Sequence, residues 1–253
     1  MNLSKVRSVI GNSGAFHFLQ DIKRYFLFLR EYSAFRKMQG STDKRFSLVW
    51  RDRFPCLNNK TTFTTFDRHY VFHPAWAARI VARVNPRIHV DISSTLHFCT
   101  IVSAFVPVKF YDFRPANLNL DNLETGAADL MALPFGDSSI PSLSCMHTIE
   151  HVGLGRYGDR LDPDGDLKAI AELQRVIKKE GHLLIVVPVG RPKIMFNAHR
   201  IYSYAQMVRY FDKLTLVEFS LIPDTGEERM IMNATEQDSD KCNYGCGCFW
   251  FKK

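Results

Sequence analysis

The chain has 253 residues, of which 46% are hydrophobic, and it carries a formal net charge of +7. This length and composition fit one large domain, alone or with an appendage, and they exclude wholesale disorder. The six cysteines include no CxxC pair, which argues against a zinc ribbon or a disulfide framework and favours a reducing, cytoplasmic location. No apolar run is long enough to span a bilayer, and we expect no cleavable signal peptide.

Residues 1–74 are predicted to form a basic, helical and irregular appendage. Apolar positions at helical spacing predict one or two amphipathic helices over residues 3–40, followed by an aromatic, irregular stretch over 46–72. Basic residues greatly outnumber acidic ones between Lys23 and Arg53. This segment could contact an anionic membrane peripherally at its inner face, or it could be a solvated basic face. We expect no specific nucleic-acid partner.

Strands and helices alternate over residues 75–253. The predicted strands are 88–92, 108–112, 130–135, 140–146, 182–189, 216–222 and 246–251. The predicted helices are 75–84, 95–105, 162–181 and 204–214, the third with Gly181 as its C-cap. This alternation predicts a doubly wound, mostly parallel, Rossmann-like α/β sheet. No helix is predicted between the last two strands, which could therefore pair antiparallel.

The most informative stretch is SLSCMHTIEHVGLGRYGD, residues 142–159. It begins as a buried strand, and titratable side chains then arrive together at His147, Glu150 and His151, followed by a glycine-rich loop. Ligands of open α/β sheets bind at the carboxyl ends of the strands. Two imidazoles and a carboxylate at such a position can bind a divalent metal or move protons.

Several motifs occur in a characteristic order. Asp91 and Asp112 lie at the ends of the first two predicted strands, and Asp129 immediately precedes the third. The motifs IEHV and RVIKKEGHLL come later in the chain. Together these motifs resemble the class I S-adenosylmethionine-dependent methyltransferase family over about residues 75–251. The strings EHVGLGRYGD and FNAHR are similar to an uncharacterised bacterial branch of that family, often associated with polysaccharide biosynthesis.

The resemblance implies that S-adenosylmethionine is the cofactor. It implies that Asp112 holds the ribose hydroxyls and Asp129 the adenine amine, while Asp91 and Ser93 belong to the first loop, which approaches the methionine portion. The alternative is that Asp112 and Asp129 only form turns at strand ends. The first loop departs from the family pattern because residues 91–97 contain no glycine. A serine side chain disfavours positive φ and close approach of the backbone to a ligand.

Three interpretations remain open for the polar cluster. In the first, a histidine deprotonates a sugar hydroxyl and Glu150 orients that histidine. In the second, the cluster binds a divalent metal, and the imidazoles favour manganese, iron or zinc over magnesium. The catalytic candidates and the metal-ligand candidates are the same four residues: His147, Glu150, His151 and His199. In the third interpretation, the cluster is structural.

The predicted acceptor-binding residues lie in the loops around this cluster: Arg156, Tyr157, Asp159, Asn197 and Arg200. On spacing alone Cys242, Cys246 and Cys248 could be metal ligands, although a closing strand explains them as small hydrophobic residues. We expect a methyltransferase that acts on a sugar or glycan precursor in surface polysaccharide biosynthesis. The alternatives are a cofactor-less binding or scaffold protein of this fold and a metal-dependent isomerase or hydrolase.

Overall fold

The computed structural model describes residues 3–39, 45–224, 226 and 229–253, with side chains from residue 18 onward. The chain divides into two compact units, Met1–Thr65 and Phe66–Lys253. Residues 40–44, which lie within the predicted basic segment between Lys23 and Arg53, are outside the described residues. In the described part of the chain, no helix has the apolar composition over the length that crossing a bilayer requires.

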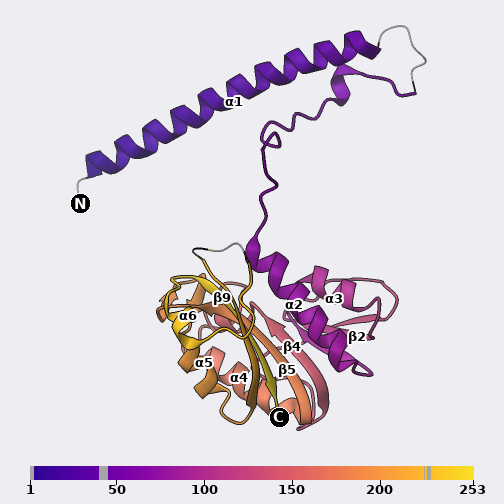
Figure 1. The fold of residues 1–253 in the computed structure, drawn as a ribbon, viewed down its shortest axis with the longest axis vertical. Coiled ribbons are helices and arrows are strands. Elements are labelled where there is room, and N and C mark those ends of the chain that lie inside the picture. The colour runs from indigo at the N-terminus through magenta and orange to yellow at the C-terminus, as the bar shows by residue number, and fades with distance from the viewer. Residues whose placement is uncertain (1–2, 40–44, 225, 227–228) are drawn as a thin grey trace. The chain divides into compact units, whose positions relative to one another are not determined.

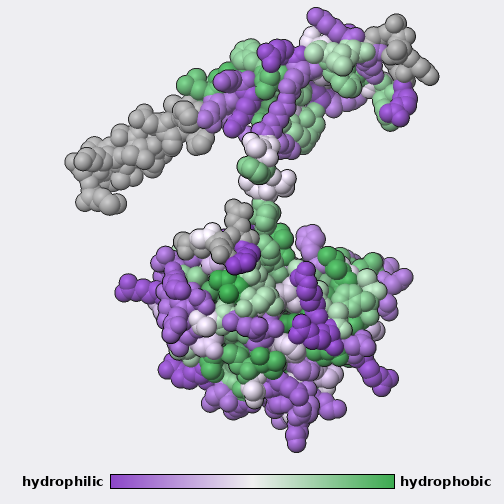
Figure 2. All heavy atoms as spheres, viewed as in Figure 1, coloured by the Kyte–Doolittle hydropathy of each residue, from purple (hydrophilic) through white to green (hydrophobic). Residues whose placement is uncertain are grey.

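The first unit is built on one long helix, α1 (Leu3–Gln39), and contains a short 3-10 helix, η1 (Trp50–Asp52). The segment after α1 packs back on it, with the Tyr32 ring centroid 4.9 Å from that of Trp50 and an Arg24–Asn58 hydrogen bond of 2.8 Å. Hydrophobic and hydrophilic residues are intermixed on the face of this unit shown in Figure 2. The sequence predicted one or two helices in this region, and the structure has one, which spans residues 3–39.

The second unit is a seven-stranded sheet with the order β3-β2-β1-β4-β5-β9-β8. The first five strands in this order are parallel, and β9 is antiparallel to both neighbours. The strands are β1 (His89–Ile92), β2 (Val108–Asp112), β3 (Leu123–Ala127), β4 (Ile140–Met146), β5 (Ile177–Val189), β8 (Thr215–Ile222) and β9 (Gly245–Lys252). The mostly parallel α/β sheet is confirmed, and the last two strands pair antiparallel as expected.

Helices cover both faces of this sheet, so it has two hydrophobic cores (Figure 1). One core lies beneath α2 (Arg68–Val84) and α3 (Leu96–Val102). The other lies beneath α4 (Gly165–Val176) and α5 (Tyr204–Tyr210). The remaining elements are the 3-10 helix η2 (Ile149–His151), the hairpin β6 (Lys193–Met195) and β7 (His199–Ile201), and α6 (Glu236–Asp240). Burial on both faces explains the continuous apolar run of β5.

The start of α2 differs from the prediction. We expected this helix, and the domain, to begin at residue 75 after Pro74, but α2 begins at Arg68 and Pro74 lies inside it. The Asp67 side chain accepts a hydrogen bond from the Tyr70 backbone N–H and caps the helix. The boundary drawn at residue 74 therefore falls within a helix, whereas the two units divide after Thr65.

Two other predicted elements were misplaced. The third strand is Leu123–Ala127, an edge strand with one buried side chain, and the apolar run 130–135 is a loop whose Leu130 and Leu133 fill the core. The third predicted helix ends at Val176 instead of Gly181. Residues 177–181 open β5, and a bulge opposite Ile140 and Ser142 accommodates the polar KKEG sequence.

Candidate active site

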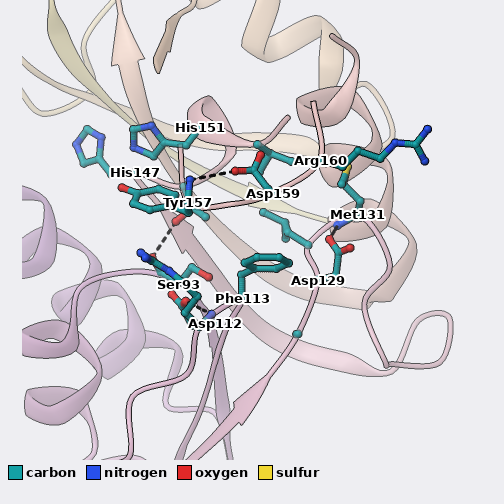
Figure 3. A pocket seen from close by; sticks show the side chains of 15 residues that line it. Ser93, Asp112, Phe113, Asp129, Met131, His147, His151, Tyr157, Asp159 and Arg160 are labelled. Carbon is teal, nitrogen blue, oxygen red and sulfur yellow. Dashed lines mark hydrogen bonds between the residues drawn. The ribbon is translucent and has the colours of Figure 1, made fainter. Parts of the chain in front are cut away.

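A cavity of about 410 Å³ lies at the carboxyl ends of the parallel strands. Asp112, Asp129 and Ser93 line it together with His147, His151 and Tyr157. Figure 3 shows the two imidazoles and the Tyr157 ring grouped on one side of the cavity and Asp129 on the other, with the Phe113 ring between Asp112 and Asp129. The volume is within the range of ligand pockets, about 300–1,000 Å³. The sequence-predicted acids of two different strand ends therefore face one hollow.

The two acids share one hydrogen-bonding pattern. Oδ1 of Asp112 accepts a 2.7 Å hydrogen bond from the Arg114 backbone N–H, and Oδ1 of Asp129 accepts one of 2.8 Å from Met131 N–H. Each acid thus forms a turn, as the alternative interpretation stated, and each keeps a second carboxylate oxygen for other partners. A carboxylate held in this way is suited to accept hydrogen bonds from a ligand in the cavity.

The glycine-free loop after β1 adopts the backbone conformation that we expected its serines to disfavour. Ser93 has a φ of 55°, and its N–H donates to the Tyr111 carbonyl at 2.7 Å. Thr148 Oγ1 donates to the Ser93 carbonyl at 2.9 Å and so holds the turn against the end of β4. The turn therefore forms without a glycine, because contacts from two neighbouring strand ends stabilise it.

Asp91 does not reach the cavity, which corrects its assignment as a cofactor-binding residue. The side chain is fully buried and accepts hydrogen bonds from Ser94 N–H at 3.0 Å and from Ser144 Oγ at 2.5 Å. His89 lies within hydrogen-bond distance of both Ser142 and Ser144, which extends this network beneath the sheet end. Burial raises the pKa of Asp91 to about 7 against the lowering effect of these hydrogen bonds. Asp91 therefore supports the loop from below.

His147 lies at the centre of the polar cluster. Nδ1 is 2.9 Å from Glu150 Oε1, and Nε2 is 3.4 Å from Cys246 Sγ. Burial lowers the pKa of His147, but the contacts with the sulfur and the carboxylate outweigh burial and raise it. The second oxygen of Glu150, Oε2, is buried and has no hydrogen-bond partner in the described structure.

One ring nitrogen of His151 is hydrogen-bonded to the backbone, and the other has no hydrogen bond within the described structure. Nδ1 lies 2.6 Å from the Ala198 carbonyl, so Nδ1 carries the hydrogen and Nε2 is left as the basic nitrogen. Glu150 Oε1 lies 3.8 Å from that Nε2. The His199 ring centroid is 6.3 Å from that of His151, and burial lowers the pKa of His199. The predicted catalytic residues are therefore neighbours.

The glycine-rich loop is held by its own acid. Asp159 Oδ2 accepts hydrogen bonds from the Gly153 and Gly155 N–H groups, and Oδ1 accepts one from Tyr157 N–H. Burial raises the pKa of Asp159, but these hydrogen bonds outweigh it and lower the pKa. The Tyr157 ring lies 4.7 Å from the Arg114 guanidinium carbon. Asp159 thus fixes the loop that brings Tyr157 to the cavity wall.

A second cavity of about 500 Å³ adjoins the first and shares His147, His151 and Tyr157 with it. Its other lining residues are mainly polar or aromatic: Tyr70, Glu150, Arg156, Asn197, Ala198, His199 and Tyr244. Three predicted acceptor residues, Arg156, Tyr157 and Asn197, are among the lining residues. The shared imidazoles stand between two hollows of different character, one largely apolar and one polar.

Arg200 does not line either cavity, so its assignment to the acceptor is corrected. The guanidinium is buried and donates to the Val152 carbonyl at 2.7 Å and to the Pro163 carbonyl at 3.1 Å. Its Nε lies 3.5 Å from Asp166 Oδ1. Five donors in a fixed fork are suited to joining several acceptors, so Arg200 ties β7 to both ends of the glycine-rich loop.

Several site residues were missed by sequence reasoning. His69 and Tyr70 lie in the first turn of α2, where we had expected an irregular segment, although His69 and His73 are four residues apart at helical spacing. Tyr244 contacts His199, with ring centroids 5.1 Å apart. Among the described residues, His69, His147 and Cys246 place one ligand atom each within 4.8 Å of one another. This group shares His147 with the four predicted metal-ligand candidates and Cys246 with the cysteines that could be ligands on spacing alone.

Comparisons with known proteins show the fold and match one part of the chain to a family model. The family model described as Caenorhabditis protein of unknown function, DUF268, matches residues 135–243. No curated protein matches the chain. A presumed methyltransferase of Bacillus halodurans is similar in structure, with a TM-score of 0.51 and 14% identity over 71% of this chain and 98% of that chain.

Two further similar structures hold S-adenosylhomocysteine. N-methyltransferase NodS of Bradyrhizobium japonicum has a TM-score of 0.51 and 11% identity over 71% of this chain and 85% of that chain. The 1,6-didemethyltoxoflavin-N1-methyltransferase of Burkholderia thailandensis has a TM-score of 0.50 and 11% identity over 72% and 78% of the two chains. At these identities the comparisons show the fold: a Rossmann-like sheet of the methyltransferase type.

Proposed function

We propose that the chain is an S-adenosylmethionine-dependent methyltransferase that acts on a hydroxyl group of a sugar or glycan precursor. The observation that carries the proposal is the pair of adjoining cavities separated by His147, His151 and Tyr157. A transfer enzyme has to hold a donor and an acceptor side by side with a proton acceptor between them. The two hollows and the imidazoles shared by them meet this requirement.

The first cavity fits the donor. The free oxygen of Asp112 would accept hydrogen bonds from the ribose diol and that of Asp129 from the adenine amine, since Oδ1 of each acid is already bound to backbone. Phe113 and Met131 offer apolar surface to the base between these acids. When bound, S-adenosylmethionine supplies an electrophilic methyl group. Ser93, which has a positive φ, lines the same cavity.

His151 is the residue we assign as general base. Its Nδ1–H donates to the Ala198 carbonyl, so the neutral ring presents Nε2 as the acceptor of the hydroxyl proton. Glu150 Oε1 lies 3.8 Å from this nitrogen. This tautomer and the position of His151 in the lining of both cavities are the two features that suit it to act as the base.

The second cavity supports the choice of a sugar acceptor. Arg156, Asn197 and His199 provide hydrogen-bonding groups, and Tyr70 and Tyr244 provide ring faces and hydroxyls. Hydroxyl-rich ligands need many hydrogen bonds together with flat apolar surfaces that match the faces of a sugar ring. The same lining would suit a sugar carried in a glycan precursor of surface polysaccharide biosynthesis, the acceptor expected from the sequence.

The test is formation of S-adenosylhomocysteine from S-adenosylmethionine with a panel of nucleotide sugars and oligosaccharides. We expect at least one acceptor to support turnover and His151→Gln to lower kcat by about 10²- to 10⁴-fold while donor binding is kept. His97→Gln, which changes an exposed histidine outside both cavities, is the matched control. Donor binding without turnover on any hydroxyl acceptor would remove the acceptor class. Absence of donor binding would favour a cofactor-less scaffold.

A further inference from the structure

Three potential metal-binding side chains from three distant elements meet beside the second cavity. His69 comes from the first turn of α2, His147 from the turn after β4, and Cys246 from β9. Their ligand atoms all lie within 4.8 Å of one another. Since positions 69, 147 and 246 are far apart in the chain, the fold itself assembles this group.

The distance between two members of this group matches the separation of two ligand atoms on one zinc ion. Cys246 Sγ and His147 Nε2 are 3.4 Å apart. Zinc lies about 2.3 Å from a thiolate sulfur and about 2.0–2.1 Å from an imidazole nitrogen, so a tetrahedral angle separates those atoms by about 3.6 Å. The rings of His69 and His147 are parallel within 5°, with centroids 5.6 Å apart. Binding of one ion by all three residues would bring their ligand atoms from within 4.8 Å of one another to separations of about 3.3–3.6 Å.

Glu150 gives an independent indication of a cation. Its Oε1 lies 2.9 Å from His147 Nδ1, which places a hydrogen on Nδ1 and leaves Nε2, the nitrogen facing Cys246, as the ring nitrogen that would bind an ion. A carboxylate on the far nitrogen of a histidine ligand is the usual outer-sphere partner in zinc proteins. The Glu150 side chain is 1% exposed and its Oε2 has no hydrogen-bond partner in the described structure. A buried carboxylate is costly unless a cation compensates it.

We propose that His69, His147 and Cys246 bind a zinc ion, with Glu150 as the outer-sphere partner of His147. Two imidazoles and a thiolate are a ligand set that zinc takes. Cys246 would release its proton as it binds, and its thiolate and the Glu150 carboxylate would then balance the charge of the ion. With three ligands from the described residues, a fourth coordination position is left for water or another donor, as in catalytic zinc sites. His147 lines both cavities, so the ion lies at their shared wall.

The zinc site is independent of the proposed methyl transfer, because the experiment that tests it measures metal binding and not enzyme activity. Purified full-length protein is stripped with a chelator, reloaded with Zn²⁺, and titrated against a chromophoric competitor. We expect one tightly bound Zn²⁺ per chain, and we expect Co²⁺ in its place to give thiolate-to-metal absorption in the near ultraviolet. Cys246→Ser should abolish that absorption and weaken Zn²⁺ binding by about 100-fold or more. Glu150→Gln should weaken it about 10- to 100-fold.

Cys145→Ser is the matched control, since Cys145 is an equally buried cysteine of the same sheet outside the ligand group. It should bind Zn²⁺ and Co²⁺ as the unchanged protein does. If Cys246→Ser does not fold, His69→Gln tests the same site from the half-buried end of α2. Folded protein that binds no Zn²⁺, or an equal loss in the Cys145 variant, would overturn the proposal. Titration of S-adenosylhomocysteine into the stripped protein tests donor binding separately.

Discussion

Asp112 and Asp129 each divide their carboxylate between a backbone N–H and the cavity. We predict that Asp112→Asn keeps the turn, because an amide oxygen still accepts from Arg114 N–H, but loses the charge that strengthens hydrogen bonds to a diol. Hydrogen bonds to charged groups contribute about 1.5–3 kcal/mol, which corresponds to affinity for S-adenosylhomocysteine that is about 10- to 100-fold weaker. Calorimetric titration measures this. The control is Asp121→Asn, because Asp121 is an exposed acid outside the cavity, and this variant should bind S-adenosylhomocysteine as the unchanged protein does. Equal affinity of the unchanged protein and both variants would contradict the role assigned to Asp112.

Asp91 makes stability depend on pH. Burial raises its pKa from 3.8 to about 7, so the folded chain retains a proton there that the unfolded chain releases as pH rises above 4. The contribution of Asp91 to stability is therefore full below about pH 4, and it is lost as pH rises to about 7, by up to ~4 kcal/mol. The Asp91→Asn variant has no ionisable group at this position, so it does not lose stability in this way as pH rises.

We therefore predict that the free energy of unfolding of Asp91→Asn, relative to the unchanged protein, increases steadily between pH 4 and pH 7 and is constant above that range. Urea unfolding at a series of pH values measures the difference. A difference that does not change with pH would show that Asp91 has an ordinary pKa in the folded chain.

At the scale of elements, α1 combines exposed aromatic side chains, Phe18 and Phe26 among them, with basic residues such as Lys23 and Arg30. Apolar and polar residues are intermixed along this unit, so the attraction to an anionic surface rests on its excess of basic residues, which meet acidic head groups. We predict that full-length protein sediments with vesicles containing phosphatidylserine and that binding weakens as salt rises. Lys23→Glu with Arg30→Glu should abolish sedimentation, and equal binding to neutral vesicles would contradict the prediction.

The elements differ in how far the sequence determines them. β1, β2 and β4 follow the prediction closely because each is a short apolar run that ends at polar groups. β3 has the sequence LETGA and one buried residue, so neither its hydrophobicity nor its alternation indicates a strand. α2 extends seven residues before Ala75 because Asp67 caps it, which outweighs the tendency of Pro74 to end helices.

The candidate site was predictable in its acids and imidazoles but not in all of its neighbours. Asp112, Asp129 and His151 follow strand ends, and parallel strands bring such positions together. The contact between His147 and Cys246 depends on the order of β4, β5 and β9 in the sheet, which no local pattern specifies. Asp91 and Arg200 are polar residues near the site that turned out to be buried supports, and sequence does not separate the two roles.

At the scale of the whole molecule, one sheet places two cavities at the carboxyl ends of its parallel strands and lets His147, His151 and Tyr157 divide them. In the proposed transfer, Asp112 and Asp129 hold the donor, and residues from α2, the β6–β7 hairpin and the segment before β9 hold the acceptor. The most direct test is calorimetric titration of S-adenosylhomocysteine into the full-length protein. We expect saturable binding of one molecule per chain; no heat from protein that is folded by circular dichroism would contradict the account.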